Sequence, residues 1–150
     1  MLKLPTTLLE AARAEVLGMG KEGIVPLASL ADKKRNGKYL GYLSALGPAL
    51  RRLGLLAALV NYRDEGSSDE LTRPVYDCLQ RLLSNQAAGL LIAGERAKLE
   101  GSGDLVDFLL TLAPQQRLHL RPRLETALLA LKLAMRTFPL PSTPEFPTDE

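Results

Sequence analysis

The feature that most constrains this chain is a run of apolar residues that recur every three or four positions. Tyr39, Leu43, Leu46, Leu50 and Leu53 are separated by 4, 3, 4 and 3 residues. An α-helix turns once every 3.6 residues, so this spacing places all five side chains on one face. The segment is therefore predicted to be an amphipathic helix that buries this face.

The same spacing returns near the end of the chain. Leu124, Leu128, Leu131, Met135 and Phe138 predict a last helix that begins near Pro122. Leu and Ala dominate the composition, and only 5% of the residues are aromatic, which favours helices over strands. No segment alternates between polar and apolar residues for long enough to predict a strand.

Shorter apolar stretches complete the predicted plan. The spacing of Thr7 and Glu10 is that of a capping box, so the first helix is expected to begin there. Leu55–Tyr62 is apolar on almost every side, which predicts a helix at the centre of the core. Helices are also expected within residues 26–35, 68–82, 86–99 and 104–112, and loops at 64–68 and 101–103.

These elements predict an all-α fold, a compact orthogonal bundle of five to seven helices in one domain that spans residues 1–138. Residues 139–150 are Pro-rich and acidic and are expected to be a disordered tail.

Two points concern the helix that carries the first apolar face. Gly47-Pro48 is expected to kink it without ending it, whereas the effect of Asn36-Gly37 stays open.

Several classes of protein are disfavoured by composition. The longest apolar run, Leu53–Val60, is far shorter than the roughly 20 residues that cross a bilayer, and no signal peptide is visible. Cys78 is the only cysteine, so no internal disulfide can form. A cytoplasmic protein without contact to a membrane is expected.

Residues that commonly act in catalysis or bind metal ions are scarce. His119 is the only histidine, so a zinc site, which needs about four Cys and His ligands, is not expected. His119 is interpreted as a loop or helix-end residue, and Cys78 as a small core residue. Gly18, Gly20 and Gly23 match a dinucleotide-binding pattern but follow a helix instead of a strand. We therefore expect no enzyme, catalytic residue, metal or cofactor.

Charge is distributed unevenly. Residues 1–63 carry a formal charge of +6, residues 64–116 carry −5 and residues 117–150 carry +1, within a net charge of +2. Such a chain can bind a polyanion at one end or stack on copies of itself.

Part of the basic excess gathers on the predicted helix. In a continuous helix over residues 34–53, Lys34, Lys38 and Arg52 share a narrow sector away from the apolar face. We call these three residues the basic ridge. Ala45 and Ala49 are expected on the same side, where their small side chains would keep it flat.

The flanking cations complete the candidate nucleic-acid-binding residues, because phosphate backbones are bound by clustered Lys and Arg. An alternative stays open: these cations only keep an exposed face hydrated. The full set of candidates is Lys33, Lys34, Arg35, Lys38, Arg51, Arg52, Arg121 and Arg123, of which the last two belong with Arg117 to a second, weaker cluster.

Two segments resemble a known family. The first has a tyrosine-containing helix at Tyr39–Leu43, a Leu46–Leu50 stretch with an internal proline, and Gly54-Leu55 before an apolar helix. The second is Arg121–Leu128 with Leu131-Lys132 after it. Together they resemble the small-subunit family of the CRISPR type III-B (Cmr) RNA-guided effector complex.

The resemblance implies a non-catalytic helical subunit. Copies of such a subunit would stack in a short filament beside the backbone subunits, with basic faces toward the guide RNA and target RNA. Two alternatives remain: a helical protein-interaction module that does not touch RNA, and a small subunit of a type III-A or type I complex.

Overall fold

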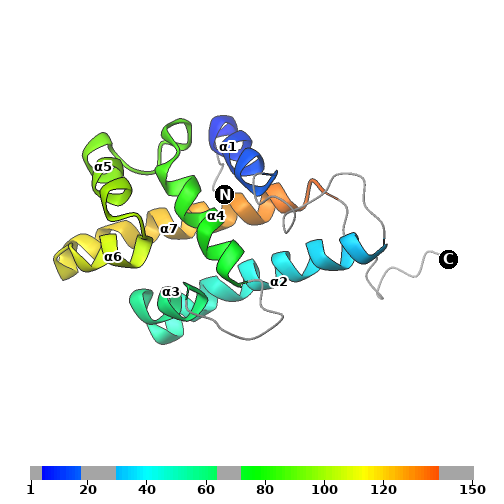
Figure 1. The fold of residues 1–150 in the computed structure, drawn as a ribbon, viewed down its shortest axis with the longest axis horizontal. Coiled ribbons are helices and arrows are strands. Elements are labelled where there is room, and N and C mark those ends of the chain that lie inside the picture. The colour runs from blue at the N-terminus through cyan, green and yellow to red at the C-terminus, as the bar shows by residue number, and fades with distance from the viewer. Residues whose placement is uncertain (1–4, 18–29, 64–71, 139–150) are drawn as a thin grey trace.

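The computed structural model describes residues 5–17, 30–63 and 72–138, with the backbone but not the side chains of residues 30–35 and 72. These residues form seven α-helices and one short 3-10 helix, and none of them lies in a strand (Figure 1). The all-α prediction is confirmed. The helices are α1 (Thr6–Leu17), α2 (Leu30–Leu53), α3 (Leu55–Arg63), α4 (Thr72–Ser84), α5 (Ala93–Ser102), α6 (Leu105–Leu110) and α7 (Pro114–Met135), and the 3-10 helix is η2 (Gln86–Ala88).

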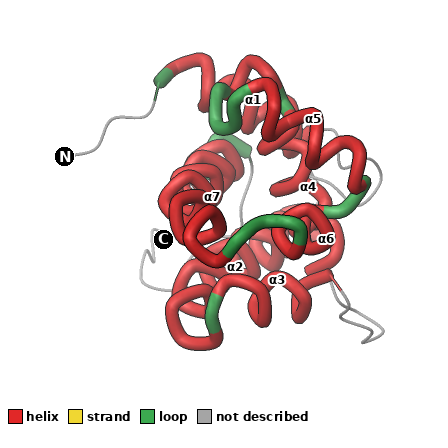
Figure 2. The backbone as a smooth tube through the Cα atoms, turned by 90° about the vertical axis from the view of Figure 1, so that its left-hand side faces the viewer, coloured by secondary structure: helices red, strands yellow, loops and turns green. Residues whose placement is uncertain are grey.

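The two longest helices organise the bundle. Helices α2 and α7 pack against each other, and α4 crosses both of them steeply (Figure 1). Helix α1 covers the later part of α7, while α3 and α6 lie toward the other end of the molecule (Figures 1 and 2). A single apolar core fills the space between these helices, with contributions from all seven.

Helix α7 contributes eight buried residues to the core and begins earlier than the sequence predicts. The five residues of its predicted stripe are all buried. The predicted start near Pro122 is wrong, because the helix begins at Pro114, where the Gln116 side chain accepts a hydrogen bond from the Ala113 N–H. Pro122 cannot donate to the Leu118 carbonyl. Both residues are exposed, so water can satisfy that carbonyl.

Helix α3 is not the central helix that its composition predicts. Ala58, Leu59 and Tyr62 are buried, but Ala57 and Asn61 are exposed. The helix lies at the edge of the bundle against α2, α4 and α6 (Figure 1), so only one side of it can be covered. Apolar composition alone does not determine which helix reaches the centre.

Helix α2 runs without a break through Asn36-Gly37 and through Gly47-Pro48. Four members of its predicted apolar stripe are buried, and the fifth, Leu53, is 48% exposed. Leu53 is the last residue of the helix, because Gly54 adopts a left-handed φ of 92° and turns the chain into α3. Among the described residues, no core element lies beyond this end to cover Leu53.

Smaller differences concern the helix ends. The Pro5 carbonyl accepts from the N–H groups of Leu8 and Leu9 at 3.1 and 3.2 Å, so α1 begins at Thr6 and not at a Thr7 cap. Residues 101–102 belong to α5 instead of a loop, and 86–99 divides into η2 and most of α5. The predictions for 18–29, 64–68 and 139–150 lie outside the described residues. None of the described helices is both long and apolar enough to cross a membrane.

Candidate nucleic-acid interface

The described part of the basic ridge is exposed on one side of α2. Lys38 and Arg52 are both exposed, and Ala45 between them is exposed as well. Fourteen residues separate Lys38 from Arg52, which places them about 21 Å apart along the axis and within about 40° around it. Ala49 is buried, contrary to expectation, because its direction lies at the border of the apolar face. The flat exposed surface beside the basic ridge is therefore narrower than predicted.

The side chains of Lys33, Lys34 and Arg35 lie outside the described residues, although their backbone belongs to α2. The helix is continuous from Lys34 to Arg52. The ridge hypothesis required this continuity, because a break at Asn36-Gly37 would have separated Lys34 from Arg52 in direction. Asn36 is itself completely buried, so the helix faces the core at this point.

Arg51 lies beside the ridge at a groove between α2 and α7. The groove has a volume of about 390 Å³ and is lined by Arg51, Glu125 and Lys132, with Ser44 and Gly47 among the α2 residues. Lys132 is a half-buried cation that the sequence patterns do not single out as a candidate. It could not be found from spacing, because only the packing of α7 on α2 brings it to the same groove as Arg51.

Three described cations of α2, Lys38, Arg51 and Arg52, differ in their contacts from most arginines elsewhere in the fold. Among the described residues, no carboxylate lies within 4.0 Å of the side-chain nitrogens of Lys38, Arg51 or Arg52. Arginines that do form ion pairs or hydrogen bonds within the fold are Arg13, Arg63, Arg73, Arg81, Arg96, Arg117, Arg121 and Arg123. Lys38, Arg51 and Arg52 therefore make no described ion pair that holds the bundle together.

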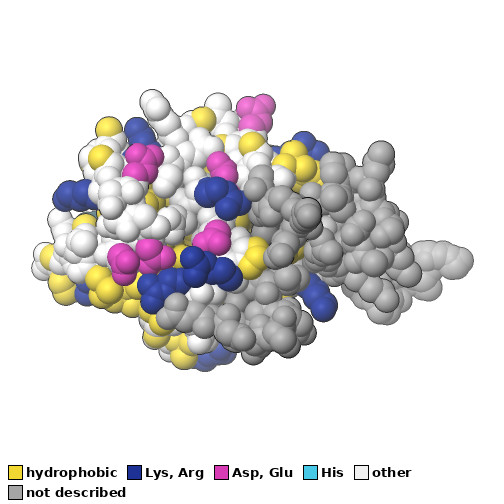
Figure 3. Space-filling model, in the orientation of Figure 1, with side chains coloured by type: hydrophobic (Ala, Val, Ile, Leu, Met, Phe, Trp, Pro, Cys, Tyr) yellow, Lys and Arg dark blue, Asp and Glu magenta, His cyan; other side chains and the backbone are white. Residues whose placement is uncertain are grey.

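Figure 3 shows the same contrast on the face toward the viewer. Basic and acidic side chains lie next to one another across its centre and left. At its lower edge, where α2 and α3 lie in Figure 1, basic side chains stand without an acidic neighbour among the described residues of this face. A polyanion that approached this edge would meet positive charge, with Glu125 as a described carboxylate in the groove beside Arg51.

The second cluster, Arg117, Arg121 and Arg123, makes contacts within the fold, unlike the basic ridge. Arg123 donates to the Glu95 carboxylate at 2.6 Å and to the Leu90 carbonyl at 3.3 Å, which joins α7 to the start of α5. Arg117 donates to the carbonyls of Leu109 and Leu112, and so caps the end of α6. Arg121 is half-buried, 3.7 Å from Glu125. The cluster does not form one surface with the ridge.

The Glu95–Arg123 pair also affects ionisation. Partial burial by itself raises the pKa of Glu95, but the hydrogen bonds from Arg123 and from the Ile92 N–H outweigh it and lower the pKa below its ordinary value. Glu95 therefore stays charged at neutral pH. The charged Glu95 carboxylate therefore holds the Arg123 guanidinium in the contact between α7 and α5.

The two residues considered for chemistry have different surroundings. His119 is exposed within α7, not in a loop or at a helix end. It lines a depression of about 400 Å³ with Lys98, Gln116 and others. Cys78 is 1% exposed, which confirms it as a core residue, and burial raises its pKa to about 12. Among the described residues, no group of three His, Cys, Asp or Glu side chains is arranged to hold a metal ion.

Comparison of this chain with protein-family models, with curated proteins and with solved structures finds no match.

Proposed function

We propose that this chain is a non-catalytic small subunit of a CRISPR type III-B (Cmr) RNA-guided effector complex, acting in the cytoplasm. The observation that carries the proposal is the unbroken helix α2, with Lys38, Arg51 and Arg52 exposed and without described carboxylate partners. Lys33, Lys34 and Arg35 lie about one turn before Lys38 on the same helix.

The mode of contact would be independent of base sequence. Lys and Arg side chains spaced over about 21 Å of one continuous helix can follow several phosphates of one RNA strand. The chain holds no tryptophan, and three of its four tyrosines, Tyr39, Tyr62 and Tyr76, are buried while Tyr42 is half-buried, so few rings are available to stack on bases. Recognition of sequence would then come from pairing between guide RNA and target RNA, as in other guided effectors.

A salt titration of binding to an RNA duplex of about 20 base pairs tests the RNA contact. Each phosphate contact contributes close to −0.9 to the slope of log K against log salt for duplex DNA and somewhat less for single strands. We expect the Lys38→Ala/Arg52→Ala variant to weaken binding and to make the slope shallower by between about 1 and 2.

A matched control is the Lys98→Ala/Arg136→Ala variant, which removes the same charge from exposed positions on other parts of the bundle. It should change the slope much less than the α2 variant does. Equal losses for the two variants would mean that only net charge matters. A salt-independent affinity of the unmodified chain would remove the RNA contact altogether.

Assignment to the Cmr complex needs a different experiment. The tagged chain should co-purify with guide RNA, with further copies of itself and with the backbone subunits of that complex. Recovery of type III-A or type I backbone subunits would transfer the assignment to one of those complexes.

The second candidate, a protein-interaction module without RNA contact, is favoured by one specific observation. Leu53 and Leu118 are 48% and 66% exposed on either side of an apolar groove. Exposed leucines around a groove are typical of surfaces that bind another polypeptide. If the chain binds partners normally but no RNA, this candidate replaces the first.

A further inference from the structure

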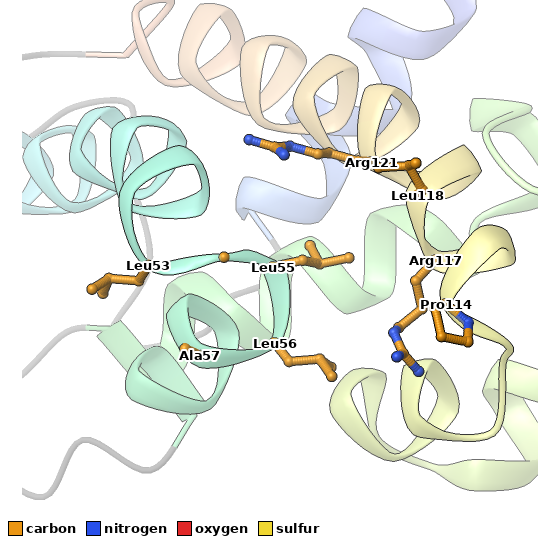
Figure 4. Close-up of a pocket in the computed structure, with 9 residues that line it drawn as sticks. Leu53, Leu55, Leu56, Ala57, Pro114, Arg117, Leu118 and Arg121 are labelled. Atoms are coloured by element: carbon orange, nitrogen blue, oxygen red, sulfur yellow. The ribbon is translucent and has the colours of Figure 1, made fainter.

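An apolar groove with arginines at its margin lies at the end of the bundle opposite the last turn of α7. It has a volume of about 340 Å³ and is formed where α2 turns into α3, opposite the first half of α7. In Figure 4, Leu55 and Leu56 extend from the start of α3 toward α7, which contributes Leu118 and Arg117 to the other wall. This volume lies within the range of sites that hold small ligands or single side chains.

The charges at the groove are of one sign. Its charged lining residues are Arg117 and Arg121, and no described carboxylate lines it. Arg117 is held by the carbonyls of Leu109 and Leu112, so its position is fixed in the absence of a partner. Arg121 extends toward α2 and has a 3.7 Å contact with Glu125. An occupant should therefore combine a large apolar side chain with flanking carboxylates.

The chain itself contains such a segment outside the described residues. Phe146 follows Glu145 directly and is followed by Asp149 and Glu150. Pro144 and Pro147 flank the Glu145-Phe146 pair, and prolines reduce the conformational freedom that is lost on binding. Three carboxylates around one phenylalanine complement two arginines around a leucine-lined groove.

The distance along α7 decides which copy supplies the segment. Leu118 and Met135 are separated by about 26 Å of helix, and Phe138 is the last described residue. The eight residues from Phe138 to Phe146 span at most about 26–29 Å when fully extended. A chain could reach its own groove only with a straight, fully extended segment. A second copy has no such restriction.

We propose that this groove binds residues 144–150 of a second copy of the chain, with Phe146 between Leu55, Leu56 and Leu118 and the acidic residues at Arg117 and Arg121. The contact is heterologous, because a groove on one copy receives a segment from another. Repetition of such a contact produces an open, head-to-tail chain of copies. The inference does not depend on the RNA contact proposed above, and its test contains no RNA.

Sedimentation velocity of the full chain over a range of concentrations tests the proposal. The mass should rise with concentration, and the Leu118→Asp and Phe146→Ala variants should each raise the dissociation constant by about tenfold or more. The Ile92→Asp variant is the matched control, since Ile92 is 68% exposed and does not line this groove. It should associate like the unmodified chain.

A mixture of the Leu118→Asp and Phe146→Ala variants provides the decisive result. The Leu118→Asp copy retains an intact 144–150 segment, and the Phe146→Ala copy retains an intact groove. Together they should form a one-to-one dimer and nothing larger. An unmodified chain that stays monomeric overturns the proposal, and so does a Phe146→Ala variant that associates normally. Position 146 lies outside the described core, so the second variant does not depend on a change within the bundle.

Discussion

The Arg63 guanidinium donates to Asp104 Oδ2 at 2.9 Å and thereby joins the end of α3 to the start of α6. Asp104 also accepts from the Tyr76 hydroxyl at 2.8 Å, and that hydroxyl accepts from the Val106 N–H. Three helices meet at this one carboxylate. We expect Asp104→Ala to lower the free energy of unfolding by about 1–3 kcal/mol, because it removes an acceptor of both Tyr76 and Arg63. Urea unfolding of the two proteins measures the loss, and an unchanged midpoint would contradict it.

The same carboxylate predicts how stability depends on pH. Partial burial raises the pKa of Asp104, but the hydrogen bonds from Tyr76 and Arg63 outweigh it and lower the pKa below the ordinary value. A group with a lowered folded-state pKa stabilises the protein above its unfolded pKa of about 3.9 and loses that contribution as the pH falls through the folded value. Unfolding at pH 7 and at acidic pH should therefore differ less for Asp104→Asn than for the unmodified chain.

Cys78 should be unreactive in the folded protein. Burial raises its pKa to about 12, so almost no thiolate is present at neutral pH. A thiol reagent should label the native chain very slowly and label it completely in denaturant. The rate of native labelling then reports opening of the core around α4. Rapid labelling under native conditions would mean that this helix is not packed as described.

Two glycines should respond to alanine in opposite directions. Gly54 has a φ of 92° between α2 and α3, a conformation that costs an L-residue about 1–2 kcal/mol. Gly41 lies inside α2, and no described neighbour comes within 4 Å of the place that an alanine Cβ would take, so alanine should stabilise the helix by about 0.5–1 kcal/mol. Thermal unfolding of Gly54→Ala and Gly41→Ala checks both signs. A stabilised Gly54→Ala would contradict the left-handed turn.

The sequence predicted those parts of the fold that depend on local spacing. The stripes of α2 and α7 repeat at the helical period, so their buried faces could be assigned without knowledge of any partner helix. The turn between α2 and α3 is likewise local, because Gly54 has a left-handed φ of 92° and glycine is preferred where a helix ends in such a residue.

The remaining features depend on which helices meet. Leu55–Tyr62 has the composition of a central helix, yet its position at the edge follows from the packing of α2, α4 and α6 around it. Nothing in the sequence patterns distinguishes a paired arginine such as Arg123 from an exposed one such as Arg52. Only the structure places Glu95 at 2.6 Å from one and no described carboxylate near the other. The contribution of Lys132 to the Arg51 groove likewise requires α7 to lie on α2.

This difference between Arg123 and Arg52 gives the last prediction. Arg123→Ala removes a hydrogen-bonded ion pair between α7 and α5 and should lower the free energy of unfolding by about 1 kcal/mol. Arg52→Ala removes an exposed cation and should change it by less than about 0.5 kcal/mol. RNA affinity at low salt should respond in the opposite order, with the larger loss for Arg52→Ala. Each variant loses one positive charge, so net charge is controlled within the pair. If the two variants lost equal stability and equal affinity, the separation between structural and RNA-facing arginines would be wrong.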